Sequence, residues 1–177
     1  MPESESQSEE RKDALLERAL MYAAQVEQQI ASQNERIEYL QSLSYTDELT
    51  GLFNQRGFAE QVKRTLAAAR RFGHTGVLVY CDLDNFKEIN DSHGHCVGDK
   101  VLRRIAEVAR HSLREIDTIA RLGGDEFAML IAQIKWTDGM KRVQSLQWAI
   151  KGVPSDGLPE VKVSLGIEPY GPNDTPE

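Results

Sequence analysis

The sequence predicts an α+β protein, in which a mixed domain of helices and strands follows a long N-terminal helix. The 177 residues suffice for one ordinary domain and one extended element. A segment near the N-terminus lacks Gly and Pro and carries apolar residues at heptad spacing. After it, helical patterns alternate with short apolar runs that are separated by glycine-containing turns, which is typical of an α/β or α+β domain.

The composition excludes several classes of protein. The chain has 28 Asp and Glu against 21 Lys and Arg, a net charge of -7, so we expect no polymeric nucleic acid as a partner. No apolar run approaches the roughly 20 residues that cross a bilayer, and we expect no membrane segment in this chain. The only cysteines are Cys81 and Cys96, and the polar N-terminus does not resemble a signal peptide. These features predict a reduced, cytoplasmic protein.

The first two segments of the chain differ in polarity. Residues 1–11 are acidic and almost free of apolar side chains, so they are expected to be disordered. Residues 12–44 are predicted to form a single helix. Its apolar residues fall on two lines, with a polar interruption at Gln33: Leu16, Ala23, Ile30 and Ile37 on one, and Ala19, Val26 and Leu40 on the other.

This narrow apolar stripe has no second stripe in the chain on which to pack. A homodimer through a two-stranded coiled coil is the natural way to bury it. Two alternatives stay open: the stripe packs back on the following domain, or it binds a regulatory protein.

Residues 45–177 are expected to form the globular domain. Apolar periodicity and glycine turns predict, in order, a helix over 58–71, a strand over 76–82, a helix over 100–113, a hairpin of strands 118–122 and 126–131, a helix over 139–150 and a strand over 161–167. From the strand at 76–82 onward, the order βαββαβ fits a ferredoxin-like sheet with packed helices.

Carboxylates follow apolar strands at two places. Asp82 and Asp84 end the strand that begins at Gly76, and Asp125 and Glu126 follow the predicted hairpin turn. Uncompensated acids at the rim of a sheet are costly unless a cation binds there, and oxygen ligands without His or Cys favour Mg or Mn. Taken one at a time, these acids are better explained as turn residues or exposed strand ends, but two acidic strand ends together with a glycine turn favour a cation site.

The polar connection after Asp84 offers groups for a nucleotide. Lys87 and backbone amides of a helical turn can receive phosphates, while Asn90 and Asp99 can contact a guanine base. A carboxylate accepts hydrogen bonds from the N1 and N2 hydrogens of guanine, so this pair favours guanine over adenine. The alternative for Asp99 is an N-cap of the helix predicted to begin at Lys100.

Three ordered motifs resemble the GGDEF family of diguanylate cyclases. They are Asp-Glu-Leu-Thr-Gly-Leu-Phe-Asn at 47–54, the stretch from Asp82 to Asp99 with its Asp-Leu-Asp-Asn-Phe-Lys start, and Arg-Leu-Gly-Gly-Asp-Glu-Phe at 121–127. The resemblance covers about 44–167. It implies a palm-like fold, shared with nucleotidyl cyclases and polymerases, and a bacterial enzyme that condenses two GTP into cyclic di-GMP.

The resemblance assigns roles to the matching residues. It implies metal ligands at Asp82, Asp125 and the carbonyl of Leu83, and catalytic roles for Asp125, Glu126 and Lys87, with Asp125 favoured as the proton acceptor. The implied substrate-binding residues are Phe86, Lys87, Asn90, Asp99, Gly123 and Gly124. Each domain is expected to hold one GTP, so two domains must face each other and the coiled coil would bring them together.

A second implied site binds the product and inhibits the enzyme. Arg114 and Asp117 match the family's Arg-x-x-Asp motif, which precedes the hairpin. Arg can bind a guanine edge bidentately and Asp can accept from it. The alternative is an Arg that favours the C-terminal helix dipole, with Asp in the next turn. The family's site uses a further Arg that the sequence does not place.

The chain departs from the family's pattern after its final predicted strand. The family continues into a helix with a Lys and an Arg for the GTP phosphates, and residues 171–177 predict no such helix. The segment between the hairpin and the final strand is also short. The rival function is therefore a catalytically silent receptor for cyclic di-GMP or GTP, which signals through the N-terminal helix to a protein partner, although its intact metal acids argue against that function.

Overall fold

The computed structural model describes residues 3–43, 45–151 and 157–175. The chain forms two compact units, residues 1–44 and 45–177. Residue 44, the predicted end of the long helix, lies outside the described residues.

The first unit is one helix, α1, from Glu3 to Leu43. It begins before the predicted start near Lys12, so residues 3–11, which were expected to be disordered, are helical. The reason is that Glu, Gln and Arg are good helix formers and neither Gly nor Pro interrupts this span. Apolar residues of the heptad pattern remain exposed in the single chain, including Val26 at 38%, Ile30 at 51% and Ile37 at 52%.

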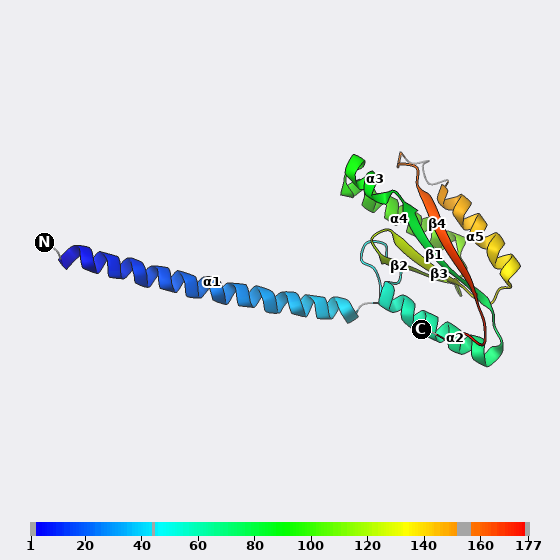
Figure 1. The fold of residues 1–177 in the computed structure, drawn as a ribbon, viewed down its shortest axis with the longest axis horizontal. Coiled ribbons are helices and arrows are strands. Elements are labelled where there is room, and N and C mark those ends of the chain that lie inside the picture. The colour runs from blue at the N-terminus through cyan, green and yellow to red at the C-terminus, as the bar shows by residue number, and fades with distance from the viewer. Residues whose placement is uncertain (1–2, 44, 152–156, 176–177) are drawn as a thin grey trace. The chain divides into compact units, whose positions relative to one another are not determined.

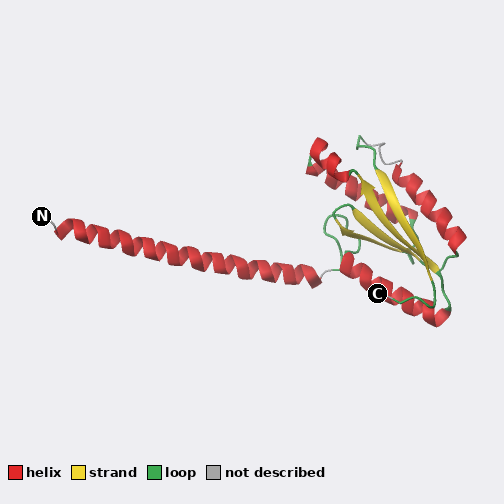
Figure 2. Cartoon of the chain, viewed as in Figure 1, coloured by secondary structure: helices red, strands yellow, loops and turns green. Residues whose placement is uncertain are grey.

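The second unit is an α+β domain, and its fold class agrees with the sequence prediction (Figures 1 and 2). Its elements are α2 (Gln55–Phe72), β1 (Gly76–Asp84), α3 (Phe86–His93), α4 (His95–Ser112), β2 (Thr118–Gly123), β3 (Glu126–Ile131), α5 (Trp136–Lys151) and β4 (Lys162–Tyr170). The strands form one sheet in the order β2-β3-β1-β4 with every neighbouring pair antiparallel. This is the ferredoxin-like arrangement.

Most element boundaries differ from the sequence prediction, and α3 was expected only as one helical turn; two of the differences affect the site or the edge of the sheet. Helix α4 begins at His95 instead of Lys100, so Asp99 lies within the helix and is not its N-cap. Strand β4 continues past the predicted end at Ile167 to Tyr170 and includes Pro169. Proline is tolerated there because β4 is an edge strand, in which one side of the backbone needs no hydrogen-bond donor.

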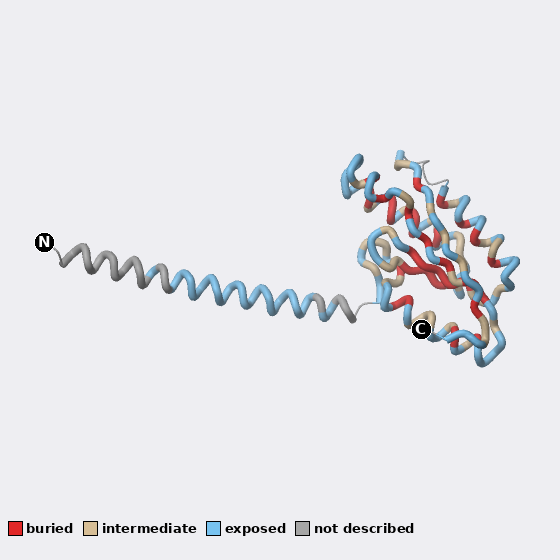
Figure 3. Tube along the Cα trace, in the orientation of Figure 1, coloured by how far each residue is buried: buried red, intermediate tan, exposed pale blue. Residues whose placement is uncertain are grey.

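The sheet lies between two apolar clusters, and Figure 3 shows buried residues along its central strands. Val77, Val79, Cys81 and Leu83 are each at most 3% exposed and share one core cluster with residues of α4 and α5. Leu78, on the opposite face, packs against a second cluster that includes Phe58 and Leu66 of α2. Helices therefore cover both faces of the sheet. Helices α4 and α5 lie on one face, and α2 lies on the other, where it contacts β2. In the described part of the chain, no helix is long and apolar enough to cross a membrane.

Candidate active site

The acidic end of β1 is the centre of the candidate site. In the sheet register, Asp82 is paired with Glu126 of β3 on one side and with Ser164 of β4 on the other. Partial burial raises the pKa of Asp82 above its ordinary value, and the nearby charges of Asp125 and Asp84 raise it further. The structure therefore brings the two predicted acidic sites together into one region of concentrated negative charge.

The β2–β3 turn is held by Arg121. Its Nε and Nη2 donate to the carbonyl oxygen of Gly124 at 2.9 and 2.6 Å, and its Nη1 donates to both carboxylate oxygens of Asp47 at 3.3 and 3.1 Å. Gly124 has a φ of 49°, a left-handed conformation that favours glycine. The guanidinium thus connects the turn that carries Asp125 to the segment before α2.

Asp47 is itself part of a compact turn. Its Oδ1 accepts hydrogen bonds from the backbone N–H and the hydroxyl of Thr50, at 2.9 and 2.6 Å. Burial alone would raise the pKa of Asp47, but the hydrogen bonds from Thr50 and the charge of Arg121 outweigh burial and lower it. The carboxylate is therefore ionised when it holds Arg121, and the first and third sequence motifs form one unit.

A cavity of about 600 Å³ opens beside Asp82 and Glu126. It is lined by Tyr80 and Asp82 of β1, Glu126 of β3 and Ser164 of β4, among others. Its volume falls within the range of small-molecule sites, about 300–1,000 Å³. A nucleotide bound here would place its reacting groups against Asp82 and Glu126.

The donor set fits a hard divalent cation. Asp82 and Asp125 supply carboxylate oxygens, and the mutual repulsion that raises the pKa of Asp82 would be relieved by a bound cation. Within residues 3–43, 45–151 and 157–175, no group of three or more His, Cys, Asp or Glu side chains is gathered around one point. A cation here would therefore also need oxygens from the backbone, such as the carbonyl of Leu83, or from the substrate.

Helix α3 presents the predicted nucleotide contacts. Lys87 is exposed in its first turn, whereas the side chain of Phe86 is 9% exposed and belongs to the core, where it anchors the start of the helix. Asn90 lies against Gly98 of α4, so closely that a Cβ at position 98 would collide with Oδ1 of Asn90. Asp99 is one residue farther along α4, and its carboxylate lies 3.9 Å from Arg103. The pairing of α3 with α4 therefore brings Asn90 and Asp99 near each other.

The predicted inhibitory motif surrounds a buried carboxylate. The side chain of Asp117 is 0% exposed, and it accepts hydrogen bonds from the backbone N–H groups of Arg114 and Ala132 at 2.9 and 3.0 Å. Nη1 of Arg142, from α5, donates to it at 3.2 Å, and Nη2 of Arg114 donates to the carbonyl of Ala132 at 3.1 Å. Two partly exposed guanidinium groups thus flank one fixed acid.

Sequence reasoning missed two of these residues. Arg142 lies on a helix that was predicted, but its approach to Asp117 depends on how α5 packs, which local pattern does not encode. Arg121 was noted only as part of a motif, and its partner Asp47 is 74 positions away. An invariant spacing between the first and third motifs could have suggested this pair, but no single sequence can display it.

Comparisons with known proteins show the family to which the domain is similar. The family described as "Diguanylate cyclase, GGDEF domain" matches residues 44–177. Diguanylate cyclase DgcP of Pseudomonas aeruginosa is 35% identical over 99% of this chain. Response regulator PleD of Caulobacter vibrioides is 31% identical over 80% of it. The chain spans only 26% and 32% of the lengths of these two relatives.

Two solved structures are also similar to this chain in fold. The coiled coil and GGDEF domain of DgcB from Caulobacter crescentus, in complex with c-di-GMP, has a TM-score of 0.69 at 27% identity and covers 86% of this chain and 83% of its own. Diguanylate cyclase SiaD from Pseudomonas aeruginosa, in complex with its activator SiaC, has a TM-score of 0.68 at 28% identity and covers 97% of this chain and 70% of its own.

Proposed function

Because the chain belongs to the GGDEF domain family of diguanylate cyclases, we propose that it condenses two molecules of GTP into cyclic di-GMP and releases two of pyrophosphate. The observation that carries this proposal is the convergence of acids at the end of β1. Asp82 lies opposite Glu126 in the register, and Asp125 is close enough to raise the pKa of Asp82. A receptor that only bound a nucleotide would gain nothing from this repulsive arrangement.

The acids would hold a divalent cation, Mg or Mn, through Asp82, Asp125 and the carbonyl oxygen of Leu83. When bound, the cation supplies stabilisation for negative charge on the α-phosphate and the leaving pyrophosphate. Asp84 stays available to orient the strand end, since its Oδ1 accepts a hydrogen bond from Ser164 at 2.7 Å. Glu126 would lie close to the reacting hydroxyl group.

The nucleotide would be oriented by α3, α4 and the hairpin turn. Asn90 and Asp99 would contact the Watson–Crick edge of guanine, and Lys87 would contact the phosphates. The backbone around Gly123 and Gly124 can approach the phosphates closely because neither residue has a side chain. With these contacts, one unit holds one GTP and selects it against ATP.

In the reaction, the 3′-hydroxyl oxygen of one GTP attacks the α-phosphorus of the other. Asp125 accepts the hydroxyl proton, a bond forms between this oxygen and the α-phosphorus, and the bond to the β-phosphate oxygen breaks with release of pyrophosphate. A second transfer in the opposite direction closes the ring. Two units must face each other, and pairing of α1 would raise their effective concentration.

We further propose that cyclic di-GMP binds at Arg114, Asp117 and Arg142 and inhibits the enzyme. The two guanidinium groups can donate to guanine edges, and Asp117 is already fixed by backbone hydrogen bonds. The exposed surface of α1 is the candidate site for a regulatory protein, as SiaD has an activator, SiaC.

The test is to incubate the purified chain with GTP and Mg and to measure cyclic di-GMP and pyrophosphate. We expect product from the wild-type chain and a loss of about 100-fold or more in the Asp125→Asn variant, because general-base catalysis typically contributes 10²–10⁴-fold. Asp138→Asn, on the exposed surface of α5, is the matched control and should keep full activity.

Two outcomes would contradict the proposal. If Asp125→Asn made product as fast as the wild type, Asp125 would not be the base. If a folded wild-type chain made no product but bound cyclic di-GMP, the receptor function would replace the cyclase. Comparison with a chain extended beyond Glu177 would show whether further residues are needed for the phosphates.

A further inference from the structure

The two edges of the sheet differ in whether a neighbouring segment is hydrogen-bonded to them. At the β2 edge, the backbone N–H of Phe53 donates to the carbonyl of Ile119 at 3.3 Å, and the N–H of Arg121 donates to the carbonyl of Phe53 at 2.8 Å. The segment before α2 therefore covers that edge. At the other edge, β4 pairs with β1 along its whole length, and no segment among the described residues pairs with its outer side. An unpaired strand of this kind is a template for another strand.

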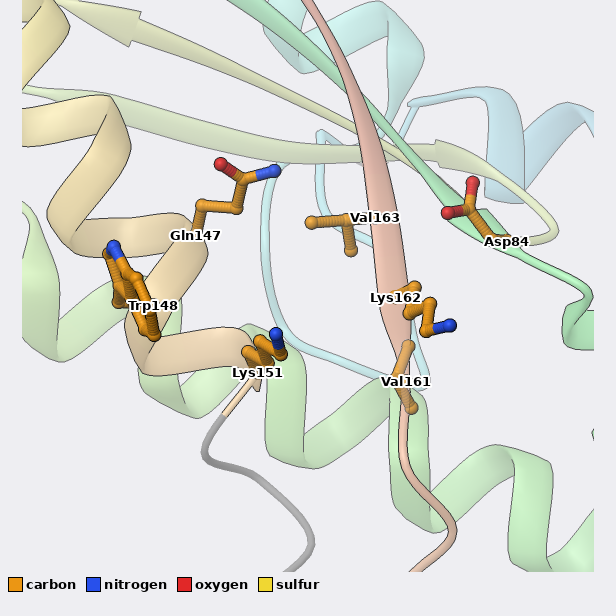
Figure 4. A pocket seen from close by; sticks show the side chains of 7 residues that line it. All are labelled: Asp84, Gln147, Trp148, Lys151, Val161, Lys162 and Val163. Atoms are coloured by element: carbon orange, nitrogen blue, oxygen red, sulfur yellow. The ribbon is translucent and has the colours of Figure 1, made fainter.

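The apolar side chains of β4 are also incompletely covered. Val163, Leu165 and Ile167 pack against the main core but stay only partly buried, in contrast to the neighbouring residues of β1, which are at most 3% exposed. Beside them, a cavity of about 370 Å³ opens between α5 and β4. Figure 4 shows Val163 on the side of β4 that faces α5, with Trp148 and Lys151 of α5 across the cavity from it.

The exposed Trp148 indicates that this surface, between α5 and β4, is a protein interface. Its side chain is 73% exposed, and its ring is contacted by the ammonium group of Lys151, 5.6 Å from the ring centroid. Large aromatic side chains are enriched in protein interfaces and are costly to leave in water. The exposed Trp, the half-buried apolar residues and the open strand edge are continuous with each other.

The charges of β4 identify the partner. Lys162 and Glu168 are both exposed, and they lie at equal distances in sequence from Leu165, one on each side. We propose that β4 pairs in an antiparallel manner with β4 of a second copy of this chain, centred on Leu165. In this register, Lys162 of each copy lies opposite Glu168 of the other, and each such pair is attractive.

The same register also matches the apolar side chains. Val163 of one copy lies opposite Ile167 of the other, and the two Leu165 residues lie opposite each other. All of these side chains are on one face, because residues that alternate along a strand share a face. The contact is isologous, so it closes as a dimer instead of growing into a fibre. The α5 helices lie on this face, and Trp148 would be covered as they approach.

This pairing has a consequence that rests on the proposed function. Two strands paired in this way are related by a two-fold axis perpendicular to the sheet. The equivalent faces of the two sheets therefore point in the same direction. The two Asp82 sites would then open side by side and could not face each other across two GTP molecules. The β4 dimer is therefore a resting assembly, distinct from the face-to-face pair that makes cyclic di-GMP.

Disulfide trapping tests the contact without depending on activity. The full chain would carry Cys96→Ser to remove the exposed thiol, and Leu165→Cys to place one thiol on the axis. Cα atoms of directly opposed residues are about 4.5–5.5 Å apart, within the range that a disulfide spans. The remaining Cys81 is only 3% exposed, so its thiol is not accessible for cross-linking.

The matched control is Lys63→Cys, an exposed position on α2 that is tethered to the same α1. We expect the Leu165→Cys chain to form covalent dimers about tenfold faster or more under mild oxidation, because pairing raises the effective concentration of the two thiols. Equal rates at the two positions would overturn the proposal.

Charge reversal then tests the register. Lys162→Glu or Glu168→Lys, each added to the Leu165→Cys chain, should slow trapping about tenfold, because two attractive pairs become repulsive. The two reversals together should restore the rate, and circular dichroism would establish that every variant is folded. Trapping that is insensitive to the single reversals, or that is not restored by the double reversal, would exclude this register. Neither result depends on cyclase activity.

Discussion

At the residue scale, Gly98 determines where the amide of Asn90 can lie. A Cβ at this position would collide with Oδ1 of Asn90 and would come 3.2 Å from Cζ of Phe86. Gly98→Ala should therefore displace the proposed guanine contact, although alanine favours the helix by about 1 kcal/mol. We expect the KM for GTP to rise about tenfold, as for the loss of one good hydrogen bond. Initial rates at several GTP concentrations would measure it.

The control for this prediction is a double-mutant cycle. Asn90→Ala alone should also raise the KM, and adding Gly98→Ala to it should change little, because the shortened side chain leaves room for the new methyl group. Additive losses in the double variant would mean that Gly98 acts through Phe86 and the core. An unchanged KM in Gly98→Ala would contradict the proposed position of Asn90 in the site.

A second prediction at this scale concerns Asp47 and pH. In Asp47→Asn, the side-chain oxygen can still accept from Thr50, but the charge that holds Arg121 is lost. The variant should be less stable at pH 7 by about 1–2 kcal/mol, the size of a hydrogen bond to a charged group at a partly exposed site. Urea unfolding of both proteins over a pH series would measure the difference.

The sign follows from the direction of the pKa shift. The native-state pKa of Asp47 lies below its ordinary value of 3.8, so its stabilisation is fully present above that value and is lost as the pH falls through the native-state pKa. The stability difference between the two proteins should therefore be constant near neutrality and shrink below about pH 4. A difference that did not shrink in acid would mean that the Asp47→Asn substitution destabilises the protein by another cause.

At the element scale, the periodicity of apolar residues and the glycine turns predicted the helices and strands whose formation depends on local sequence. The apolar run after Gly76, the glycine turn at 123–124 and the heptads of α1 each correspond to an observed element. The start of α4 at His95 was missed because Gly94 and His95 carry no capping signal, while Asp99 offers one that the structure does not use. The end of β4 was missed because Pro169 normally argues against a strand, and only its edge position permits it.

The site was predicted less completely than the fold. The acids of β1 and of the hairpin could be placed together, because a hairpin beside the central strand brings them to one rim. The contacts of Arg121 with Asp47 and of Arg142 with Asp117 join residues that are distant in sequence. They depend on the packing of whole elements, so no local pattern contains them.

The packing of α5 places Arg142 beside Asp117, and a substitution of Arg142 tests whether this contact is part of the proposed inhibitory site. Arg142→Ala should weaken cyclic di-GMP binding and relieve product inhibition, while Asp117 keeps its two backbone donors and the fold persists. We expect a loss of affinity of about tenfold to 100-fold, the scale of one charge-assisted contact. Calorimetry with cyclic di-GMP, together with initial rates at rising product concentration, would measure it.

Arg142→Lys is the matched variant, because it keeps the charge but cannot donate in a planar, bidentate way. An intermediate loss of affinity is expected. If Arg142→Ala bound cyclic di-GMP as tightly as the wild type, the ligand would not contact α5, and the pair of Arg142 with Asp117 would only join α5 to the sheet.

At the scale of the whole molecule, the described side chains of α1 are exposed, and they include the apolar residues Val26, Ile30 and Ile37 of its stripe. Pairing of two α1 helices would bury the stripe and bring two catalytic units together, which the proposed reaction requires. Under the proposed function, the activity of the catalytic unit therefore depends on the pairing of α1. This dependence can be measured by breaking the pairing at one seam position.

The variant is Ile30→Glu, which places two like charges against each other in the seam, and Gln28→Glu on the opposite face of α1 is the control. Both would carry Lys162→Glu to remove pairing through β4. Ile30→Glu should sediment as a monomer at low micromolar concentration and lose about 100-fold in specific activity, because intramolecular encounter is replaced by encounter in solution. Its specific activity should then rise with protein concentration, whereas that of the control should be constant. A monomer with undiminished activity would show that α1 is not what brings the two catalytic units together.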